Sequence, residues 1–485
     1  MSSGTAAHSE GAVPGGGEPR PQRGDELELR VDSLAFGGEG VARLGQGGYV
    51  VFVAGAIPGD RVRAVVHKRK RSYAHARTVE LLEPSPERIA PLADHPGVPW
   101  QVIPYERQLE VKQAQVGEAL RRLGRLDGFV LEEIVPALET WRYRNKLEYS
   151  FGRGEGGELV CGFHAGAGAG GVAAMSDCLL ASERGNRARE AALAWCRAQG
   201  LEPWERWPAP GQPQAARTAP DADGRARLRN LTVREGRRSE RLQVRLVTTA
   251  GELDAGALAA ALSAELGEQL SGVLWTRSDS LAETTAGGET ELVWGEQQLP
   301  ERLGELELRI SPEAFFQTNT EMAELLYGAV AEYAALEGWE RVYDLYCGIG
   351  TIALTLAPRA GELWGIELVP GAVADAIAGA ARNAVTSARF FAGDARLALP
   401  ELVGRAGRPD VLVVDPPRAG LSKKALRRVV EAAPRRIVYV SCNPTTLAPN
   451  AAELVEAGWR LQRVRPVDMF PQTHHIESVA LFERA

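Results

Sequence analysis

The last third of the chain alternates short apolar runs with helical stretches, and this alternation limits the fold more than any other feature. After about Ser311 the apolar runs are Val342–Tyr346, Leu363–Glu367, Ala388–Phe391, Val411–Asp415 and Ile437–Val440. The helical stretches between them are Ile352–Leu356, Val369–Ala381, Lys423–Ala433 and Thr446–Glu456. This pattern predicts an α/β domain whose parallel sheet is covered by helices on both faces. Trp459–Val464 and Ser478–Phe482 would close the sheet, one of them antiparallel.

The 485 residues are enough for three domains at about 100–200 residues each. Residues 25–84 combine short strands with Gly and Pro turns, which predicts a small OB-like β-barrel. Residues 85–310 predict a central α+β domain, and residues 311–485 form the α/β domain. Residues 1–24 are rich in Gly, Pro and Ser, as is typical of a disordered tail.

Some elements of the central domain can be assigned from pattern alone. Tyr105–Leu123 has helical periodicity, Trp141–Phe151 is typical of a strand, and Leu228–Val233 could pair with Leu242–Val247. Two segments indicate irregular structure. These are the glycine loop Ala165–Gly171 and the Pro-rich stretch Pro203–Asp223.

Composition excludes several classes of protein. No apolar run approaches the ~20 residues of a membrane span, and the N-terminus lacks the apolar core of a signal peptide, so we expect a cytoplasmic location. The five cysteines are scattered without a CxxC pair, which argues against a disulfide framework or a four-thiolate zinc site. Most of them should be buried small apolar residues.

Two segments favour a nucleic-acid partner although the net charge is −7. His67–Tyr73 is a dense cationic run with an aromatic residue, on a hairpin of the predicted barrel. Contact with a phosphate backbone explains such a run better than a solvated hairpin tip does. Trp141–Lys146 also mixes basic and aromatic residues, which suits RNA, although an amphipathic strand edge would have the same composition.

Polar residues follow the first three predicted strands of the α/β domain, where open sheets of this kind bind ligands. The first strand leads into the glycine turn Asp344–Thr351, which lacks the third glycine of a dinucleotide fingerprint and the lysine of a P-loop. Glu367 ends the second strand, where an acid can accept ribose hydroxyls, and Asp394 follows the third, where it can contact a base. These residues favour S-adenosylmethionine over the alternative, a nicotinamide cofactor.

The fourth and fifth strands end in residues that suit covalent chemistry. Asp415 precedes two prolines that fix a rigid turn, so it could recognise a nucleobase or an intermediate. Cys442 lies between a strand and a helix, where helix-terminal amides favour a thiolate, so a nucleophile is preferred over an inert buried cysteine. Addition of a thiolate to C6 of uridine makes C5 nucleophilic enough to accept a methyl group. A base must then remove the C5 proton, and Glu477 is our candidate. The adjacent His474 and His475 lack a third metal ligand.

Taken together, these motifs resemble the RNA uracil-C5 methyltransferase family, specifically its 23S ribosomal RNA branch with an N-terminal TRAM domain. The resemblance covers nearly the whole chain after residue 24. It rests on Phe315–Asn319, Asp344–Thr351, Asp415–Arg418, Ser441–Pro444 and His475–Glu477. It implies a Rossmann-like class I methyltransferase domain, RNA as the partner and no obligate protein partner.

The resemblance also implies roles for particular residues. Cys442 would be the nucleophile and Glu477 the proton acceptor. The residues implied to line the S-adenosylmethionine pocket are Gln317, Tyr346, Thr351, Glu367, Asp394 and Asp415. Cys347 also lies at a strand end, but it belongs to the cofactor turn and is implied to have no catalytic role.

One departure from the family concerns a [4Fe–4S] cluster that many members carry. Gln101, Gln108, Leu109 and Lys112 match the stretch that follows the cluster-binding segment in those members. The expected cysteine positions instead hold Ile89, His95 and Val98, and only Cys178 corresponds to a ligand. Because a cluster needs its thiolates, we predict none, and packing around Pro96–Trp100 would replace its structural role.

Other functions remain open at this point. The substrate could be transfer RNA, although the TRAM-like domain favours ribosomal RNA. The Asp-Pro-Pro turn also resembles those of amine methylases, so an enzyme that methylates a cytosine C5 or an exocyclic amine is an alternative. A third possibility is an RNA-binding protein with a vestigial catalytic domain, which the intact cofactor and nucleophile positions disfavour.

Overall fold

The computed structural model describes residues 20–45, 48–164, 171–205, 220–221, 223–282 and 284–484. The glycine loop Ala165–Gly171, the Pro-rich stretch Pro203–Asp223 and the predicted tail 1–24 lie largely outside these ranges. The chain divides into two compact units. The first comprises residues 1–90 with 102–104, and the second comprises 91–101 with 105–485. Among the described residues, no helix has the length and apolar character needed to span a membrane.

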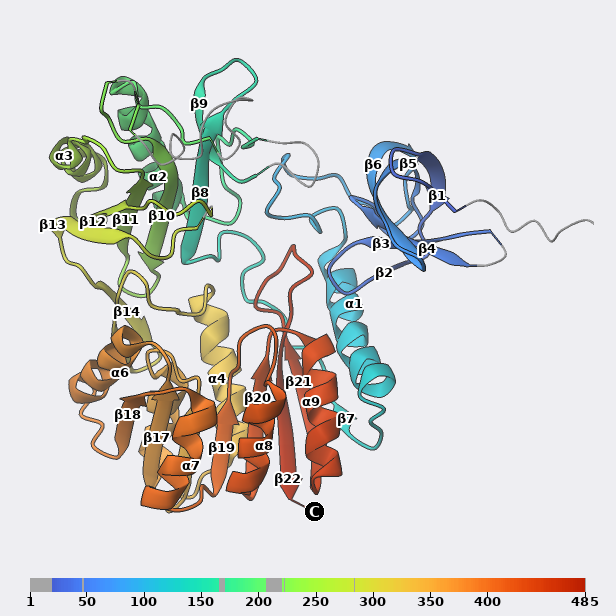
Figure 1. The fold of residues 1–485 in the computed structure, drawn as a ribbon, viewed down its shortest axis with the longest axis vertical. Helices are drawn as coiled ribbons and strands as arrows, with labels where there is room; N and C mark the ends of the chain where they lie inside the picture. Colours follow the sequence, from blue (N-terminus) through green and yellow to red (C-terminus); the bar gives the residue numbers. More distant parts are fainter. Residues whose placement is uncertain are drawn as a thin grey trace, which may run out of the picture. The chain divides into compact units, whose positions relative to one another are not determined.

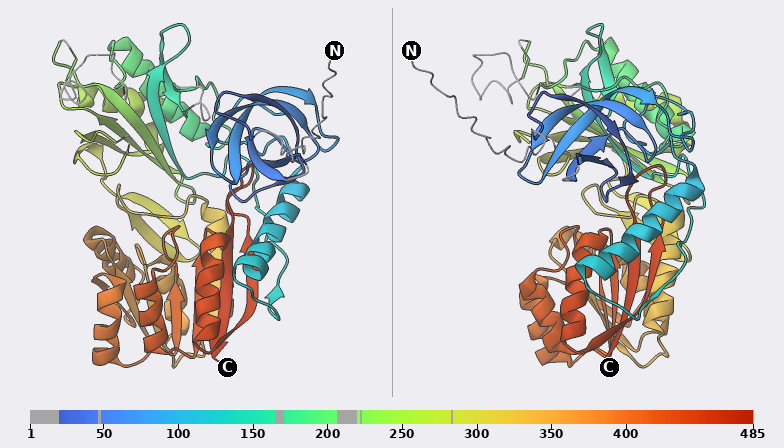
Figure 2. Two further views of the ribbon diagram at one scale, coloured as in Figure 1. Left: turned by 45° about the vertical axis from the view of Figure 1, so that its right-hand side comes forward. Right: turned by 90° about the vertical axis from the view of Figure 1, so that its right-hand side faces the viewer.

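The first unit is built on one six-stranded sheet in the order β1-β5-β6-β4-β3-β2. The strands are β1 (Glu26–Arg30), β2 (Ser33–Leu34), β3 (Gly40–Leu44), β4 (Tyr49–Ala54), β5 (Arg61–Arg69) and β6 (Tyr73–Glu83). The sheet curls, and β1 at one edge contacts β3 near the other (Figure 2). Along β4 and β6 alternate residues are buried, so small and branched apolar side chains such as Val51, Val53, Ala74 and Ala76 fill the inside. This agrees with the predicted β-barrel architecture.

The second unit contains two large sheets. The central sheet has the order β13-β12-β11-β10-β8-β9. Its strands are β8 (Lys146–Arg153), β9 (Leu159–Gly162), β10 (Leu228–Gly236), β11 (Arg241–Thr248), β12 (Leu270–Arg277) and β13 (Glu289–Gly295). Helices α2 (Glu183–Ala198) and α3 (Ala255–Leu266) pack together on this sheet (Figure 1). The predicted pairing of β10 with β11 is confirmed. The predicted strand from Trp141 starts five residues late, because Arg142 has a positive φ of 54° that interrupts extended backbone.

The second large sheet has eight strands in the order β18-β17-β16-β19-β20-β22-β21-β7, and it is named the catalytic sheet because the site residues expected from the sequence follow its strands. Their bounds are β7 (Val130–Leu131), β16 (Arg341–Leu345), β17 (Glu362–Glu367), β18 (Ala388–Ala392), β19 (Val411–Val414), β20 (Arg436–Ser441), β21 (Trp459–Val467) and β22 (Glu477–Arg484). The strands from β18 to β20 are parallel, and β22 is antiparallel to both β20 and β21. The predicted parallel sheet and its antiparallel closing strand are therefore confirmed.

Helices cover both faces of the catalytic sheet (Figure 1). They form two layers, and within each layer neighbouring helices contact one another. One layer is α4 (Thr320–Ala334), α5 (Thr351–Leu356) and α6 (Pro370–Arg382); the other is α7 (Ala395–Ala406), α8 (Lys423–Ala432) and α9 (Pro444–Glu456). Strand β19, in the middle of the sheet, is apolar along its whole length, and all four of its residues are buried. Between the two sheets lies the hairpin of β14 (Leu299–Leu303) and β15 (Leu306–Ile310), whose first strand contacts β10 and α4.

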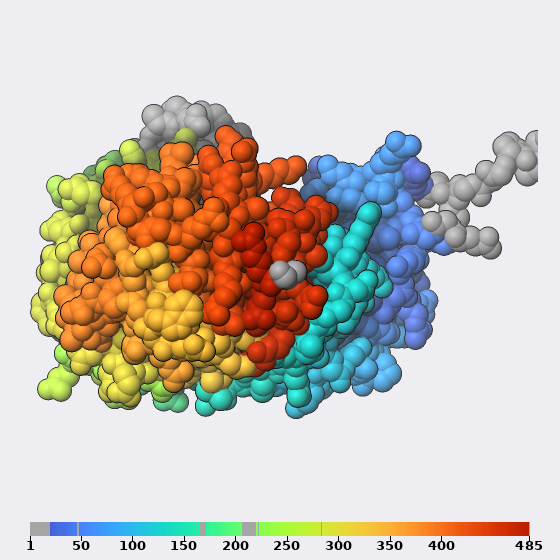
Figure 3. All heavy atoms as spheres, turned by 90° about the horizontal axis from the view of Figure 1, so that it is seen from below, coloured from blue at the N-terminus to red at the C-terminus, as the bar shows by residue number. Residues whose placement is uncertain are grey.

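A segment from the middle of the chain completes the catalytic sheet. Helix α1 (Tyr105–Glu118) continues into a π-helical turn, η1 (Ala119–Leu123), that packs against α9. Strand β7 then pairs in parallel with β21. Figure 3 shows this teal segment beside the red C-terminal elements. We propose 25–84, 85–310 and 311–485 as the domains, with α1, η1 and β7 packed on the last of them.

Candidate active site at the carboxyl edge of the catalytic sheet

The parallel strands of the catalytic sheet end at one edge, and each end is followed by a predicted site residue. Tyr346 follows β16, Glu367 is the last residue of β17, and Asp394 lies two residues beyond β18. Asp415 directly follows β19, and Cys442 directly follows β20. Because parallel neighbours point the same way, the topology gathers these side chains at one edge.

Cys442 and Glu477 are brought together by antiparallel pairing. Ser441, the last residue of β20, pairs with Ser478 of β22, so the residues next along each strand are Cys442 and Glu477. Strand β22 starts at this edge because it runs against its neighbours. Thirty-five positions separate the thiol from the carboxyl in sequence, and the register places them side by side.

The surroundings of Cys442 disfavour its thiolate in the ligand-free protein. Burial, followed by the carboxyls of Glu477 and Asp415, raises the pKa of the thiol to about 11, while Arg418 acts in the opposite direction. The thiolate-favouring effect expected from the start of α9 is therefore outweighed by burial and neighbouring acids. The raised pKa keeps the thiol protonated near neutral pH.

Three acids lie in the enclosed part of the site. Burial and the nearby Asp415 raise the pKa values of Glu477 and Asp344 well above the ordinary carboxyl range. Burial raises the pKa of Asp415 itself to about 7. Burial raises the pKa of Tyr327 in α4, and all three carboxyls act on it in the same direction. Each raised pKa favours the neutral carboxyl, and a cationic ligand in the site would favour the ionised form.

Asp344 is a site residue that our sequence predictions omitted. It is fully buried in β16, where Oδ2 accepts a hydrogen bond from the backbone N–H of Ala353 at 3.1 Å. Oδ1 has no hydrogen-bond partner among the described residues. The sequence could have indicated Asp344, because it is an acid within a predicted apolar strand, and an acid at such a position is rarely buried without a ligand or partner.

The turn after β16 has the backbone conformation that the sequence predicts for a close ligand approach. Gly348 and Gly350 have positive φ values of 55° and 80°, and so does Tyr346 at 65°. A Cβ at Gly350 would come within 3.0 Å of Ala376 and of the Phe390 ring, so glycine is needed there. Thr351 follows, and its hydroxyl donates to Tyr327 Oη at 3.1 Å.

Glu367 and Asp394 are held by short-range hydrogen bonds. Glu367 accepts from the backbone N–H of Gly348 at 3.1 Å with one oxygen and from that of Val369 at 2.9 Å with the other. Asp394 caps α7 and pairs with Arg396, which lowers its pKa to about 2. Both carboxyls act on Tyr346, whose pKa is raised mainly by burial. These three residues thus form one group beside the glycine turn.

Gln317 does not follow one of the parallel strands but lies in the segment that precedes α4. It is buried just before α4, and its carbonyl oxygen accepts a hydrogen bond from Asn145 Nδ2 at 2.8 Å. Asn319 of the same segment caps α4 and donates to the carbonyl of Met469 at 3.2 Å. Among the described contacts, the Gln317 side chain has no hydrogen bond to another predicted site residue.

The rings of His474 and His475, just before Glu477, pack against each other at an interplanar angle of 42° with centroids 4.1 Å apart. Burial first, and then nearby cations, lower the pKa of His474 to about 4 and of His475 to about 3, so both are neutral near pH 7. Within the described ranges, no group of three or more His, Cys, Asp or Glu side chains could hold a metal ion.

At the positions that correspond to the cluster-binding segment, apolar packing surrounds Cys178. Its Sγ lies 3.4 Å from Nε2 of the buried His95, and Val98 and Trp100 are also buried. The absence of an iron–sulfur cluster stays a prediction from the missing thiolates.

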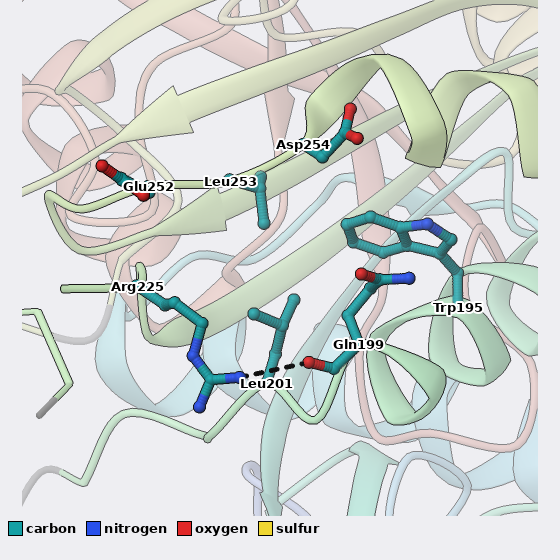
Figure 4. A pocket seen from close by; sticks show the side chains of 7 residues that line it. All are labelled: Trp195, Gln199, Leu201, Arg225, Glu252, Leu253 and Asp254. Atoms are coloured by element: carbon teal, nitrogen blue, oxygen red, sulfur yellow. Dashed lines mark hydrogen bonds between the residues drawn. The ribbon is translucent and has the colours of Figure 1, made fainter. Parts of the chain in front are cut away.

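A separate hollow of about 380 Å³ lies near the end of α2 and the start of α3 (Figure 4). It is lined by Trp195, Gln199, Leu201, Arg225, Glu252, Leu253 and Asp254. Among these residues, Arg225 donates a hydrogen bond from Nη1 to the carbonyl of Gln199 at 3.3 Å. None of the lining residues is a predicted site residue, so the hollow is not a candidate for the chemistry.

The site residues fit the expected cofactor. S-adenosylmethionine carries a sulfonium and an ammonium group, and the unpartnered Oδ1 of Asp344 together with Asp415 offers buried carboxyl oxygens for a cation. The glycine turn offers backbone without phosphate-binding machinery.

Comparisons with known proteins agree with this arrangement. A model of the tRNA (uracil-5-)-methyltransferase family matches residues 290–485, and a TRAM domain model matches residues 20–79. A protein from Chlorobaculum tepidum named as an uncharacterized RNA methyltransferase is 36% identical over 490 residues, covering 96% of this chain and 98% of the relative. A protein of the same description from Halalkalibacterium halodurans is 33% identical over 465 residues, covering 95% and 97%.

A solved structure matches nearly the whole chain. The tRNA (uracil-54, C5)-methyltransferase of Pyrococcus abyssi, in complex with S-adenosyl-L-homocysteine, superposes with a TM-score of 0.72 and 25% identity. The match covers 94% of this chain and 99% of that one.

Proposed function

Because the chain belongs to the RNA uracil-C5 methyltransferase family, a family of S-adenosylmethionine-dependent enzymes, we propose that it methylates C5 of a uridine in 23S ribosomal RNA. We further propose that Cys442 forms a covalent adduct with C6 and that Glu477 removes the C5 proton. The observation that supports this proposal is the β20–β22 register, which puts Cys442 beside Glu477 at the carboxyl edge of the parallel strands.

The reaction assigns one task to each residue. Cys442 loses its proton, for which Asp415, with a pKa of about 7, is the suitable acceptor. The Cys442 sulfur bonds to C6, and C5 takes the methyl group that S-adenosylmethionine supplies. Glu477, ionised once a cationic ligand and the substrate occupy the site, accepts the C5 proton. The bond between sulfur and C6 then breaks and the C5–C6 double bond re-forms.

The cofactor pocket is proposed to consist of Gln317, Tyr346, Thr351, Glu367, Asp394 and Asp415, with Asp344 added from the structure. Glu367 would accept ribose hydroxyls, and the carboxyls of Asp344 and Asp415 would face the cationic groups. Asp344→Asn and Glu367→Gln should each weaken S-adenosylmethionine binding about tenfold or more in calorimetry, because each loses a hydrogen bond to a charged group, worth about 1.5–3 kcal/mol. Unchanged affinity in both variants would contradict the assignment.

The choice of 23S ribosomal RNA is supported by the TRAM match. The cationic run 67–71 of the first unit supports an RNA partner of either kind. A transfer RNA uridine is the second candidate. It is favoured by the name of the Pyrococcus abyssi protein and by that of the family model.

The test is methyl transfer to defined RNAs. The enzyme is incubated with labelled S-adenosylmethionine and either unmodified 23S ribosomal RNA or unmodified transfer RNA, and the nucleosides are identified by mass spectrometry. We expect 5-methyluridine from the 23S substrate. Labelled 5-methylcytidine or an N-methylated base would refute the proposed target atom, and product from transfer RNA alone would favour the second candidate.

Two variants test the assigned residues in the same assay. Cys442→Ala should abolish product and any covalent adduct, whereas Glu477→Gln should accumulate an RNA–protein adduct that survives denaturing electrophoresis. Cys196→Ala, a buried cysteine of α2, is the matched control and should keep activity. An active Cys442→Ala enzyme would rule out the covalent route.

A further inference from the structure

A row of aromatic side chains lies on the outer surface of the sheet in the first unit. In β4 and β6 the buried residues alternate with partly exposed ones, and Phe52, Tyr73 and His75 belong to the outward set. Phe52 lies opposite His75 in the β4–β6 register, and their rings stack with centroids 5.2 Å apart at 29°. Tyr73 meets both rings edge-on at 5.6 Å and 5.5 Å, and His67 of β5 approaches His75 at 6.1 Å.

The row is fixed in place by polar contacts. His75 Nδ1 lies 3.1 Å from both carboxylate oxygens of Glu39. At the end of the row, Tyr49 donates its hydroxyl to the carbonyl of Lys70 at 2.8 Å, which ties the β5–β6 hairpin to β4. A set of rings held in this way loses little conformational freedom when a planar ligand stacks on it.

Positive charge borders the rings on one side. Lys68 lies opposite His75 in the β5–β6 register, and Arg69, Lys70 and Arg71 continue the hairpin. All four are exposed, and among the described residues none forms an ion pair with a carboxylate. Elsewhere in this unit, cations such as Arg61 and Arg63 pair with glutamates. The hairpin cations are therefore available to an anionic partner.

We propose that Phe52, Tyr73 and His75 form a stacking platform for single-stranded RNA, with Lys68 to Arg71 contacting its phosphates. Unpaired bases have flat faces on which such rings can stack, and the phosphate backbone carries the negative charge that the cationic hairpin attracts. In base-paired RNA those faces are covered, so the platform selects unpaired segments. The inference rests on the proposed RNA substrate, and it adds where, outside the active site, that RNA is held.

The experiment measures binding of the full-length protein to a fluorescein-labelled, uridine-rich single strand of about 12 nucleotides, within the range that one OB fold covers. Phe52→Ala and Tyr73→Ala should each weaken binding about fivefold or more, with an unchanged dependence on salt. Lys70→Gln combined with Arg71→Gln should instead reduce the slope of log affinity against log salt by about 1.4, at about 0.7 for each phosphate contact. RNA containing 5-iodouridine should photocrosslink to the peptides that carry Phe52 and Tyr73.

Two controls separate stacking from folding. Leu81→Ala removes an exposed apolar side chain from the same strand, β6, and should leave affinity unchanged. Phe52→Tyr keeps a ring and should keep affinity. The platform is refuted if the alanine variants bind as the unaltered protein does, or if Leu81→Ala weakens binding equally. Ring variants that bind weakly in a protein that yields no 5-methyluridine would retain the platform and reject the proposed function.

Discussion

Cys442 differs from the other four cysteines in being partly accessible. Cys161, Cys178, Cys196 and Cys347 are buried, and burial raises the pKa values of three of these thiols, those of Cys161, Cys196 and Cys347. The pKa of Cys442 is also raised, first by burial and then by the neighbouring carboxyls of Glu477 and Asp415. Its reactivity therefore depends on the charge state of Asp415 and Glu477, which substrate and cofactor would change.

Replacement of Asp415 should make the free thiol more reactive although it impairs the enzyme. Asp415→Asn removes a carboxylate that disfavours the thiolate, so the pKa of Cys442 should fall from about 11. Below that pKa, each unit of decrease gives about a tenfold larger thiolate fraction. Alkylation of Cys442 by iodoacetamide at pH 8 in the ligand-free protein, followed by peptide mass spectrometry, should therefore accelerate several-fold.

The same measurement has an internal control. The four buried cysteines should react slowly in both proteins, and a general increase in their labelling would indicate loosened folding. Slower alkylation of Cys442 in Asp415→Asn would show that Asp415 promotes the thiolate, contrary to the direction derived from the structure.

Among the structural elements, the loop between β21 and β22 determines where Glu477 lies. Helix α1 holds this loop through a fully buried ion pair, in which Lys112 Nζ lies 2.6 Å from Asp468 and donates to the carbonyl of Phe470 at 3.1 Å. Tyr105 donates to the other oxygen of Asp468 at 2.9 Å. Gln108 and Gln472 exchange two further hydrogen bonds at 2.8 Å and 2.9 Å. The stretch that the sequence identifies by resemblance therefore holds the loop that leads to Glu477.

Removal of one partner of this ion pair should destabilise the protein strongly. Lys112→Met leaves the Asp468 carboxylate buried without its cation, which typically costs about 3–5 kcal/mol. Urea unfolding should show this loss, and kcat should fall because the loop leads to Glu477. The double variant with Asp468→Leu should recover part of the stability. Lys424→Met on the exposed face of α8 is the control; an equal loss there would refute a specific role for the pair.

An element can be predicted from the sequence when the residues that determine it are close together in the chain. The parallel strands β16 to β20 are found within one residue at each end, because apolar runs bounded by Gly, Pro or Asp are local signals. Helix α7 is missed because Pro400 and Gly404 interrupt its pattern. The pairing of β7 with β21 joins residues more than 300 positions apart, so no local pattern reports it. The burial of Asp344 and the raised pKa of Cys442 likewise depend on neighbours from other strands.

At the scale of the whole molecule, buried acids and buried histidines oppose each other in their effect on stability. Glu477, Asp344 and Asp415 have pKa values above those of the unfolded chain, so above about pH 4.5 each of these acids binds its proton more fully in the folded protein than in the unfolded one. Their contribution to stability falls as the pH rises. His95, His474 and His475 have pKa values below 6.5, so their contribution falls as the pH drops below 6.5.

We therefore expect the Tm of the ligand-free protein to decline from pH 6.5 to 8.5. In the upper part of this window the histidines are neutral in both states, so of these two sets of groups only the acids still change stability, by about 1.4 kcal/mol for each pH unit over which one acid keeps its proton only when folded. Glu477→Gln should flatten the decline in thermal unfolding scans. His474→Asn combined with His475→Asn should leave it unchanged and raise the Tm at pH 5. A Tm that rises between pH 6.5 and 8.5 would mean that the acids are already ionised in the free protein, and that the site needs no cation to charge them.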